Sequence, residues 1–272
     1  MENTKEMTFA SPSFIKRLKG MLGVDFYRLF HTPLFYIFLV IAAIIPALVS
    51  MGAMGSGETG GLFTNAWQII AADKPLYIIS DMGEYANMNM VFIFGGIMVS
   101  IFIGHDYKSG YVKQLFTTHA KKEDYMMSKT CVSAFAMVCM CITYLIGGTI
   151  AGLGTGLPLE INAGSLICAL LGKMIMSLGW ASLYTFINVI FRRKFGISIA
   201  LCFVLGTGIP VIGAAALLGN NSALNIFLYG SSVQACLTSD FVSVLICLAC
   251  SVTWAIIYNV LGSILLHHRD VY

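Results

Sequence analysis

Long uninterrupted apolar runs are the feature that most constrains how this chain can fold. A helix needs about 20 predominantly apolar residues to cross roughly 30 Å of hydrocarbon, and the 272-residue sequence contains six such runs. Only 11% of the residues are charged, against about 25% in an average soluble domain, so the chain has too few charges to cover a water-exposed surface. The runs are Pro33 to Met54, about Ala86 to Gly104, about Thr130 to Gly152, about Gly164 to Phe191, about Phe195 to Leu218, and about Phe241 to Leu266.

These runs predict helices rather than membrane strands. A membrane strand crosses in about 10 residues and alternates in polarity, whereas the six runs are long and continuously apolar. Pro46 and Pro210 fall inside the first and fifth runs, where a membrane helix can bend without unfolding. The sequence therefore predicts an all-α polytopic membrane protein, with an N-terminal segment at 1–32 and a six-helix transmembrane domain at 33–272.

The distribution of basic residues predicts the orientation. Lys and Arg are enriched in the cytoplasmic segments of membrane proteins because positive charge resists translocation. Fourteen of the 16 basic residues fall in the N-terminal segment, between runs two and three, between runs four and five, or at the C-terminus. Only Lys74 lies on the other side, and Lys173 lies inside the fourth run. Both termini are therefore predicted to be cytoplasmic.

Charge, histidine and cysteine patterns argue against several other functions. The basic residues are spread along membrane edges, where anionic lipid headgroups lie, so they indicate contact with membrane lipid rather than with nucleic acid. Seven of the eight cysteines lie within runs, which argues against a disulfide framework. The five histidines lack ligand spacing, so no metal site is expected. They are His31, His105, His119, His267 and His268.

The N-terminal segment carries an amphipathic pattern between Ser13 and Phe30. Its apolar residues recur at helical spacing, and most of its basic residues lie elsewhere around the helix, as in helices that lie in the membrane interface. The alternative is a solvated leader whose basic side chains snorkel to the headgroups. The apolar positions are Phe14, Ile15, Leu18, Met21, Leu22 and Leu29.

The segment 106–129, between the second and third runs, combines charged residues with apolar anchors. Such a cytoplasmic segment can dock on a partner protein, although charges alone could also serve to hold the helix ends at the membrane edge. Its order begins with an acidic residue, followed by a glycine and a basic residue, then two apolar residues, a second basic residue, a tyrosine and a closing lysine. These are Asp106, Gly110, Lys113, Leu115, Phe116, Lys122, Tyr125 and Lys129.

This order resembles the ABC-2 type permeases, the membrane subunits of ABC transporters, including bacterial peptide and antibiotic export and immunity permeases. Asp25, Arg28 and Pro33 are similar to the acid, base and helix-start residues that precede the first span in that family. The resemblance covers nearly the whole chain. Two positions depart from the pattern, because His119 stands where proline is frequent and Lys122 where arginine is frequent.

The resemblance implies a coupling role for the segment, which would contact a separate nucleotide-binding ATPase subunit and pass its closure to the spans. It also implies a second permease subunit, identical or related, in the cell membrane, and export of a hydrophobic or amphipathic peptide or antibiotic. The sequence contains no GxxxxGK[ST] phosphate loop. The chain is therefore expected not to be an enzyme, and ATP and Mg are expected on the partner rather than on this chain.

Lys173 is a basic residue in the middle of an apolar run. It lies roughly 14 Å along the fourth helix, where a cation costs about 2.5 to 3.5 kcal/mol. It is therefore a candidate for the translocation path, unless it snorkels after a shift of the span boundary. A secondary transporter is an alternative function, although no Asp or Glu falls within the six runs to bind a coupling ion. A non-transporting sensor or scaffold is another.

Overall fold

The computed structural model describes residues 13–55, 89–117, 120–155, 163–192, 194–207, 228 and 241–268. The regular structure in these ranges is helical throughout. The helices are α1 (Phe14–His31), α2 (Pro33–Gly55), α4 (Asn89–Lys108), α5 (Tyr111–Thr117), α6 (Lys122–Thr155), α7 (Ala163–Ile190), α8 (Phe195–Gly206) and α11 (Phe241–His268).

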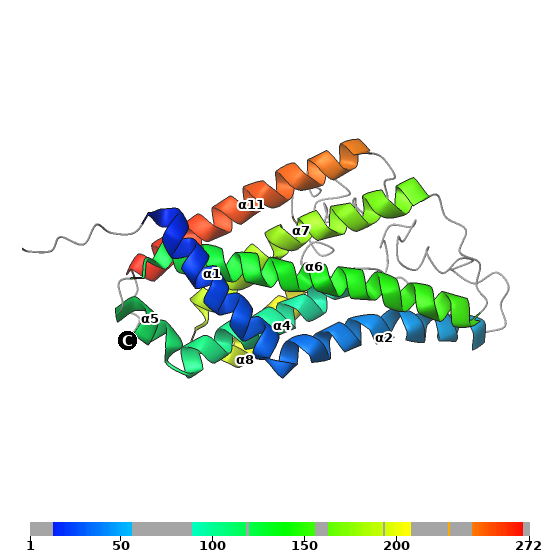
Figure 1. Ribbon diagram of the computed structural model, residues 1–272, viewed down its shortest axis with the longest axis horizontal. Helices are drawn as coiled ribbons and strands as arrows, with labels where there is room; N and C mark the ends of the chain where they lie inside the picture. The colour runs from blue at the N-terminus through cyan, green and yellow to red at the C-terminus, as the bar shows by residue number, and fades with distance from the viewer. Residues whose placement is uncertain are drawn as a thin grey trace, which may run out of the picture.

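The longer helices run side by side in an elongated bundle (Figure 1). Helix α6 lies along α2 and α7, α11 lies along α7, and α8 lies along α4. Helix α1 crosses the bundle near one end and joins α2 through a 65° bend. The start of α1, helix α5 and the end of α11 all lie at this same end.

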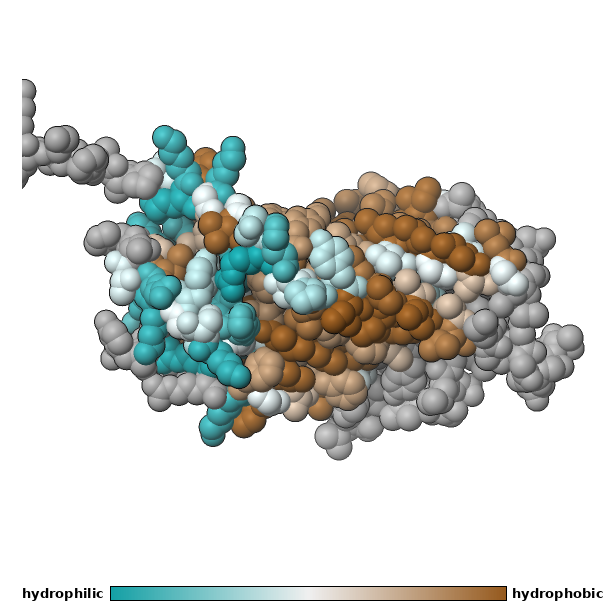
Figure 2. All heavy atoms as spheres, turned by 60° about the horizontal axis from the view of Figure 1, so that its bottom comes forward, coloured by the Kyte–Doolittle hydropathy of each residue, from teal (hydrophilic) through white to brown (hydrophobic). Residues whose placement is uncertain are grey.

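Apolar side chains fill the interior of the bundle and also cover most of its outside. Met137, Tyr144 and Trp180 are buried in the core, whereas Ile150 is 65% exposed and Ile256 is 60% exposed. Figure 2 shows an apolar body with hydrophilic residues gathered at one end. An apolar outer surface of this extent suits a hydrocarbon environment, since a water-soluble monomer rarely exposes large contiguous apolar patches.

The helical interpretation of the apolar runs is confirmed for the parts of them that the structure describes, and Pro210 lies outside these parts. Four helices are long and apolar enough to cross a membrane, and the bent pair formed by α1 and α2 would make a fifth span. Helix α8, which lies in the described part of the fifth run, has 12 residues. The count of six spans and the orientation of the termini stay predictions. The four long spans are Met90–Lys108, Lys122–Gly154, Leu166–Ile190 and Val244–His268.

The largest differences from the predicted boundaries are at the polar end of α4 and α6. Helix α6 begins at Lys122 rather than near Thr130, and α4 continues to Lys108 rather than ending at Gly104. The sequence prediction ended each span at its charged residues. These residues nevertheless continue the helices, because the side chains of Asp106 and Lys129 are paired with other charges in the interior.

A buried polar network fastens the short helix α8 to the bundle. Asn188 on α7 donates to Ser100 on α4 at 3.1 Å, and Ser198 on α8 donates to the side-chain oxygen of Asn188 at 2.6 Å. Because all three side chains are buried, these bonds satisfy groups that would otherwise be costly in an apolar interior. The network fixes α4, α7 and α8 relative to one another.

Candidate coupling site at the polar end

Helices α4 and α5 are joined by a tight turn at Gly110. This glycine has a φ of +74°, a left-handed conformation that glycine adopts without the steric cost of a side chain. Its carbonyl oxygen accepts hydrogen bonds from the backbone N–H groups of Lys113, at 3.1 Å, and Gln114, at 3.2 Å. The turn therefore ends α4 and starts α5 within two residues.

Helix α5 has one face on the bundle and one face in the open. Val112 is buried, and Leu115 and Phe116 pack against a small apolar cluster that includes Tyr125. The rings of Phe116 and Tyr125 lie edge to face, with centroids 5.7 Å apart. Lys113 is exposed on the same short helix. The side chains that point inward fix the helix and leave Lys113 available to a partner.

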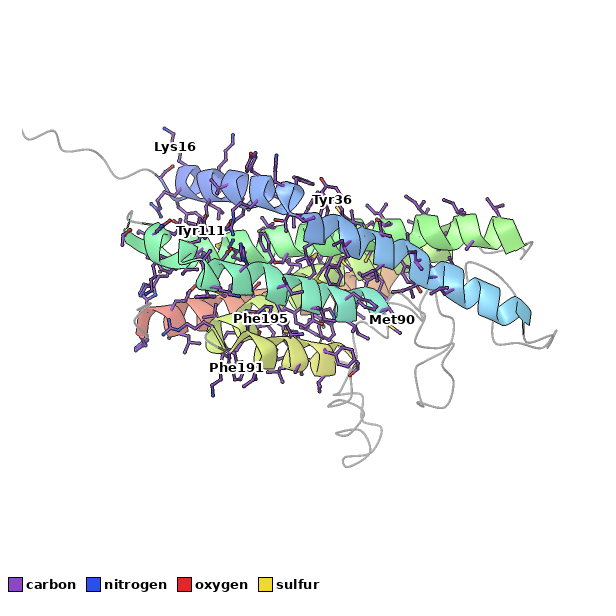
Figure 3. All side chains as sticks on the ribbon, turned by 90° about the horizontal axis from the view of Figure 1, so that it is seen from below. Lys16, Tyr36, Met90, Tyr111, Phe191 and Phe195 are labelled. Atoms are coloured by element: carbon purple, nitrogen blue, oxygen red, sulfur yellow. The ribbon has the colours of Figure 1, made fainter. Side chains whose placement is uncertain are left out.

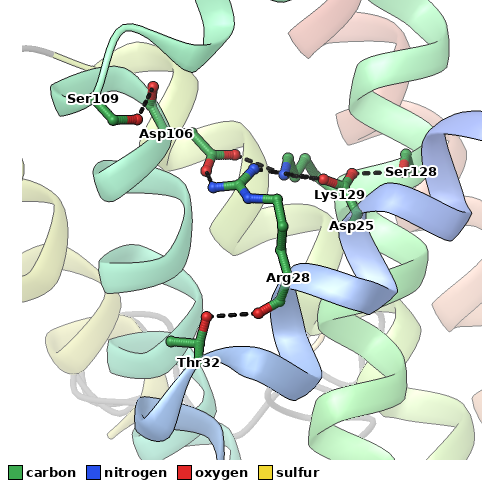
Figure 4. A network of polar contacts seen from close by, with 7 residues as sticks. All are labelled: Asp25, Arg28, Thr32, Asp106, Ser109, Ser128 and Lys129. Atoms are coloured by element: carbon green, nitrogen blue, oxygen red, sulfur yellow. Dashed lines mark hydrogen bonds and ion pairs between the residues drawn. The ribbon is translucent and has the colours of Figure 1, made fainter.

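Four charged side chains meet beneath this segment in what we call the charge ring, formed by Asp25, Arg28, Asp106 and Lys129 (Figure 4). The Lys129 Nζ lies 2.6 Å from an oxygen of Asp25 and 2.6 Å from an oxygen of Asp106. The Arg28 guanidinium is paired with Asp106 and lies 3.8 Å from Asp25. Acidic and basic groups thus alternate around the ring.

The charge ring is almost completely removed from water. The side chains of Asp25, Asp106 and Lys129 are 0% exposed, and that of Arg28 is 23% exposed. Buried charges are tolerated when they are paired and hydrogen-bonded, and Ser128 supplies such a bond by donating to Asp25 at 2.7 Å. Loss of one member would leave an uncompensated charge in the interior.

Aromatic rings surround the two cations. The Arg28 guanidinium lies over the ring of Tyr111, 4.2 Å from its centroid, and the Lys129 Nζ lies 4.8 Å from the centroid of Phe102. Burial raises the pKa of Tyr111, and the nearby carboxylates of Asp25 and Asp106 raise it further, against the opposing effect of Arg28. Tyr111 is therefore a neutral phenol at physiological pH, with its ring stacked on a cation.

Two further polar contacts fasten helices at this end. The Nε of Arg17 on α1 donates to Asp124 on α6 at 2.8 Å, and the Nζ of Lys122 donates to the carbonyl oxygen of Leu266 at 2.6 Å. The second bond satisfies a carbonyl in the last turn of α11, which has no partner within its own helix. The start of α6 is thereby joined to both α1 and α11.

The structure brings some of the predicted site residues together and keeps others apart. It brings Asp25, Arg28 and Asp106 together in one ring, whereas Lys122 lies apart, against the end of α11. Asp106 and Tyr125 are fully buried within the chain, so any part they play in coupling is to hold the segment from inside. Lys113 is exposed and can contact a partner protein directly, and it lies beside the half-buried Leu115 and Phe116.

The sequence order names Lys129 only as the closing lysine of the segment 106–129, and it does not single out Ser128 or the pair of Arg17 with Asp124. Lys129 is the central cation of the ring, and it stands 104 residues from Asp25 in the chain. Its place in the family-like order was a signal, although the same lysine also fits a simple helix-end charge. Its partners become evident only once α1 and α6 are packed together.

Lys173 lies inside the bundle on α7 and is 1% exposed. Its Nζ is 5.5 Å from the centroid of the Phe92 ring on α4. The side chain therefore points toward a neighbouring helix rather than outward, and its role in a translocation path stays a prediction. Among the described residues, no group of three or more His, Cys, Asp or Glu side chains could hold a metal ion.

The fold and this site define a multi-pass helical membrane protein with one polar end, which buried ion pairs hold together. Residues 22–209 match the model of the family described as ABC-2 family transporter protein. This match covers more than half of the chain and includes the whole charge ring, so the chain belongs to the ABC-2 family of transporter proteins. It is a membrane permease of the ABC transporter class. No curated protein matches the sequence.

Proposed function

We propose that this permease is the membrane-spanning subunit of an ATP-binding cassette exporter, driven by ATP that a separate subunit hydrolyses. The observation that carries the proposal is α5, a seven-residue helix held between two spans at the polar end of the bundle. It presents Lys113 on an open face while its apolar side is fixed by Tyr125. A short helix that is packed firmly between two spans can transmit the movement of a bound partner to those spans.

The proposal places the polar end in the cytoplasm, with both termini on that side. The excess of basic residues in these segments supports this orientation, as does the shared position of the start of α1 and the end of α11 (Figure 1). ATP and Mg would bind to the partner ATPase, because this sequence has no phosphate loop of the GxxxxGK[ST] form.

The substrate that we propose is a hydrophobic or amphipathic molecule, such as a peptide or an antibiotic, exported across the cell membrane. Membership of the ABC-2 family supports export, and the apolar outer surface of the bundle would suit entry from the bilayer. A second permease subunit, identical or related, would complete the path. Lys173, buried on α7, would act within the bundle on this path.

Co-purification tests the partner. A Walker-motif ATPase, sought first among the genes next to this one, is co-expressed, and the permease is isolated in detergent. We expect the ATPase to follow the permease, and Lys113→Glu to weaken the association, because this charge reversal is on the open face of α5. Lys16→Glu is the matched control, since Lys16 is exposed on α1 and points away from the bundle (Figure 3). Equal recovery of the ATPase with both variants would contradict the role of α5.

Export is tested in proteoliposomes that contain the permease and its ATPase. We expect ATP-dependent movement of a labelled amphipathic peptide, and loss of movement when the ATPase carries a disabled Walker lysine. Movement driven by an ion gradient without ATP would instead support a secondary transporter.

A further inference from the structure

We propose that α7 contains a hinge between Ile175 and Gly179, that Ser251 on α11 makes this hinge possible, and that α7 bends there during transport. The proposal goes beyond the proposed function, because it describes how the half of α7 that carries Lys173 moves relative to the rest of the bundle. It is carried by one buried hydroxyl that bonds to both backbone groups of a single helical hydrogen bond.

The Ser251 side chain bonds to the backbone of α7 at two points. Its hydroxyl donates to the carbonyl oxygen of Ile175 at 2.7 Å and accepts a bond from the backbone N–H of Gly179 at 2.9 Å. In a regular α-helix these two backbone groups, four residues apart, bond to each other. Insertion of a side chain into this ladder is one of the few identified causes of a bend in a helix. The contact therefore marks 175–179 as the place where α7 bends.

Gly179 lets α11 approach closely enough for this contact. A Cβ atom at this position would lie 3.3 Å from the Cα of Ser251 and 2.5 Å from the Cδ2 of Leu228, so a side chain here would force its neighbours to shift. Glycine inside a helix is also less favourable than alanine, by about 1 kcal/mol. The same residue thus admits the hydroxyl and weakens α7 at the point of insertion.

Two further hydroxyls bond to the backbone of α7 on either side of the hinge. Ser177 donates to the carbonyl oxygen of Lys173 at 3.0 Å, and Ser182 donates to that of Gly179 at 2.7 Å. Serine bonds to a carbonyl one turn earlier slightly destabilise a helix and often bend it. In hydrocarbon, a backbone group that leaves the helical ladder needs another partner, and serine hydroxyls supply one. These carbonyls therefore stay bonded when α7 bends.

The two halves of α7 are held differently. Toward the polar end, Tyr184 donates to the backbone of α4 at 2.9 Å, and Asn188 belongs to the buried polar network that joins α7 to α4 and α8. Toward the other end, Ile167 is 55% exposed and Leu171 is 42% exposed. Helix α7 lies between α6 and α11 (Figure 1), and α11 is the least buried of the four long spans. The half of α7 at the polar end is therefore fixed, and the half at the other end can tilt.

Distances between spin labels test the hinge in the full-length permease in nanodiscs, without the ATPase. Labels are attached through non-natural amino acids at exposed positions. The far pair is Ile150 on α6 with Ile167 on α7, and the polar-end pair is Met127 on α6 with Lys194, directly before α8. A tilt of roughly 20° at a point about 15 Å from Ile167 along the helix moves that position by about 5 Å, so we expect the wild-type distances of the far pair to spread over about 5 Å more than those of the polar-end pair.

Ser251→Ala is the decisive variant. It removes the inserted hydroxyl, so the carbonyl of Ile175 and the amide of Gly179 can bond to each other directly, and we expect the variant to fold. The far pair should then become as narrow as the polar-end pair. Thr253→Ala is the matched control, because it removes a hydroxyl that is exposed on the same helix, and both pairs should stay as in wild type. Ser251→Cys, whose thiol is a weaker donor and acceptor, should lie between wild type and Ser251→Ala.

Two results would overturn the hinge. One is a wild-type far pair that is as narrow as the polar-end pair, and the other is a far pair that stays broad in Ser251→Ala. Export per ATP, measured in proteoliposomes with the ATPase, should fall several-fold in Ser251→Ala relative to Thr253→Ala, and equal export would overturn the part of the hinge in transport. Because the distances are measured without the ATPase, a wild-type permease that exports nothing would remove the proposed exporter and leave the test of the hinge itself unaffected.

Discussion

Buried charge is the dominant energetic feature at the scale of single residues. Lys129 is fully buried and compensates two carboxylates at once. Its neutralisation leaves Asp25 and Asp106 with Arg28 alone, and removal of one partner from a buried pair costs about 3 to 5 kcal/mol.

We therefore expect Lys129→Gln to lower the free energy of unfolding by about 3 to 5 kcal/mol, measured by denaturation in mixed micelles. Lys113→Gln is the matched control. Its lysine is exposed, so its effect should lie within about 0.5 kcal/mol. Equal stability of the two variants would show that the charge ring does not hold this end together.

The second residue-scale prediction concerns Lys173, which is buried beside Phe92. We expect Lys173→Met to reduce export while the amount of permease in the membrane stays unchanged, because Met keeps the volume and loses the charge. The measurement is substrate movement per unit of reconstituted protein. Lys173→Arg, which keeps the cation, should retain more export than Lys173→Met. Full export by the Met variant would remove Lys173 from the mechanism.

The sequence order singles out residues that the structure brings together at the polar end, and it carries less information about what they touch. Asp25, Arg28 and Asp106 could be selected from their order in the chain. Their convergence could not, since Arg28 and Asp106 are 78 residues apart and meet only when α1 crosses the bundle. Tyr125 was selected as a contact residue, and its complete burial reflects packing against Phe116, which no local pattern encodes.

The turn at Gly110 governs the position of a whole element, helix α5. A residue with a side chain pays a steric cost of about 1 to 2 kcal/mol in the left-handed conformation, although open space surrounds this glycine. We expect Gly110→Ala to lower the free energy of unfolding by about 1 kcal/mol and to weaken ATPase co-purification. Gly110→Asn should have a smaller effect, because asparagine tolerates this conformation better. If Ala and Asn behave alike, backbone strain is not the cause.

Helix starts and ends were predictable where a proline or a change of composition marks them. The predicted starts at Pro33, Phe195 and Phe241 coincide with those of α2, α8 and α11. The predicted start of α6 is too late, because the charged residues 122–129 continue the helix beyond the apolar run. Apolar periodicity also predicted helix α1, and its buried residues Met21 and Leu29 show that part of this face packs on protein.

The polar end of the bundle governs how the whole molecule sits in a membrane. The hydrophilic end contains α5 and the turn beside Ser109, whose side chain is exposed. We expect a single cysteine at Ser109, in a variant without reactive native cysteines, to react with an impermeant maleimide only after the cells are permeabilised. A cysteine at Thr64, which lies between the first two apolar runs and so on the predicted outer side, should react in intact cells. Labelling of position 109 from outside would reverse the orientation.

Composition and apolar run length were sufficient to predict the fold class, because hydrocarbon requires every spanning backbone to satisfy its own hydrogen bonds. They were insufficient for the packing of the spans. The buried polar network of Ser100, Asn188 and Ser198, for example, forms only where three helices meet. A serine in an apolar run does not indicate which residue it will bond.

The alternation of two acids and two bases in the charge ring makes the junction of α1 with α4 and α6 electroneutral. An electric field exerts no net force on a neutral group, and mobile ions screen buried pairs far less than exposed ones. Export per ATP should therefore change little with membrane voltage or ionic strength, once the ATPase is bound. This connection would stay intact in a cell whose membrane is depolarised or whose medium rises in ionic strength.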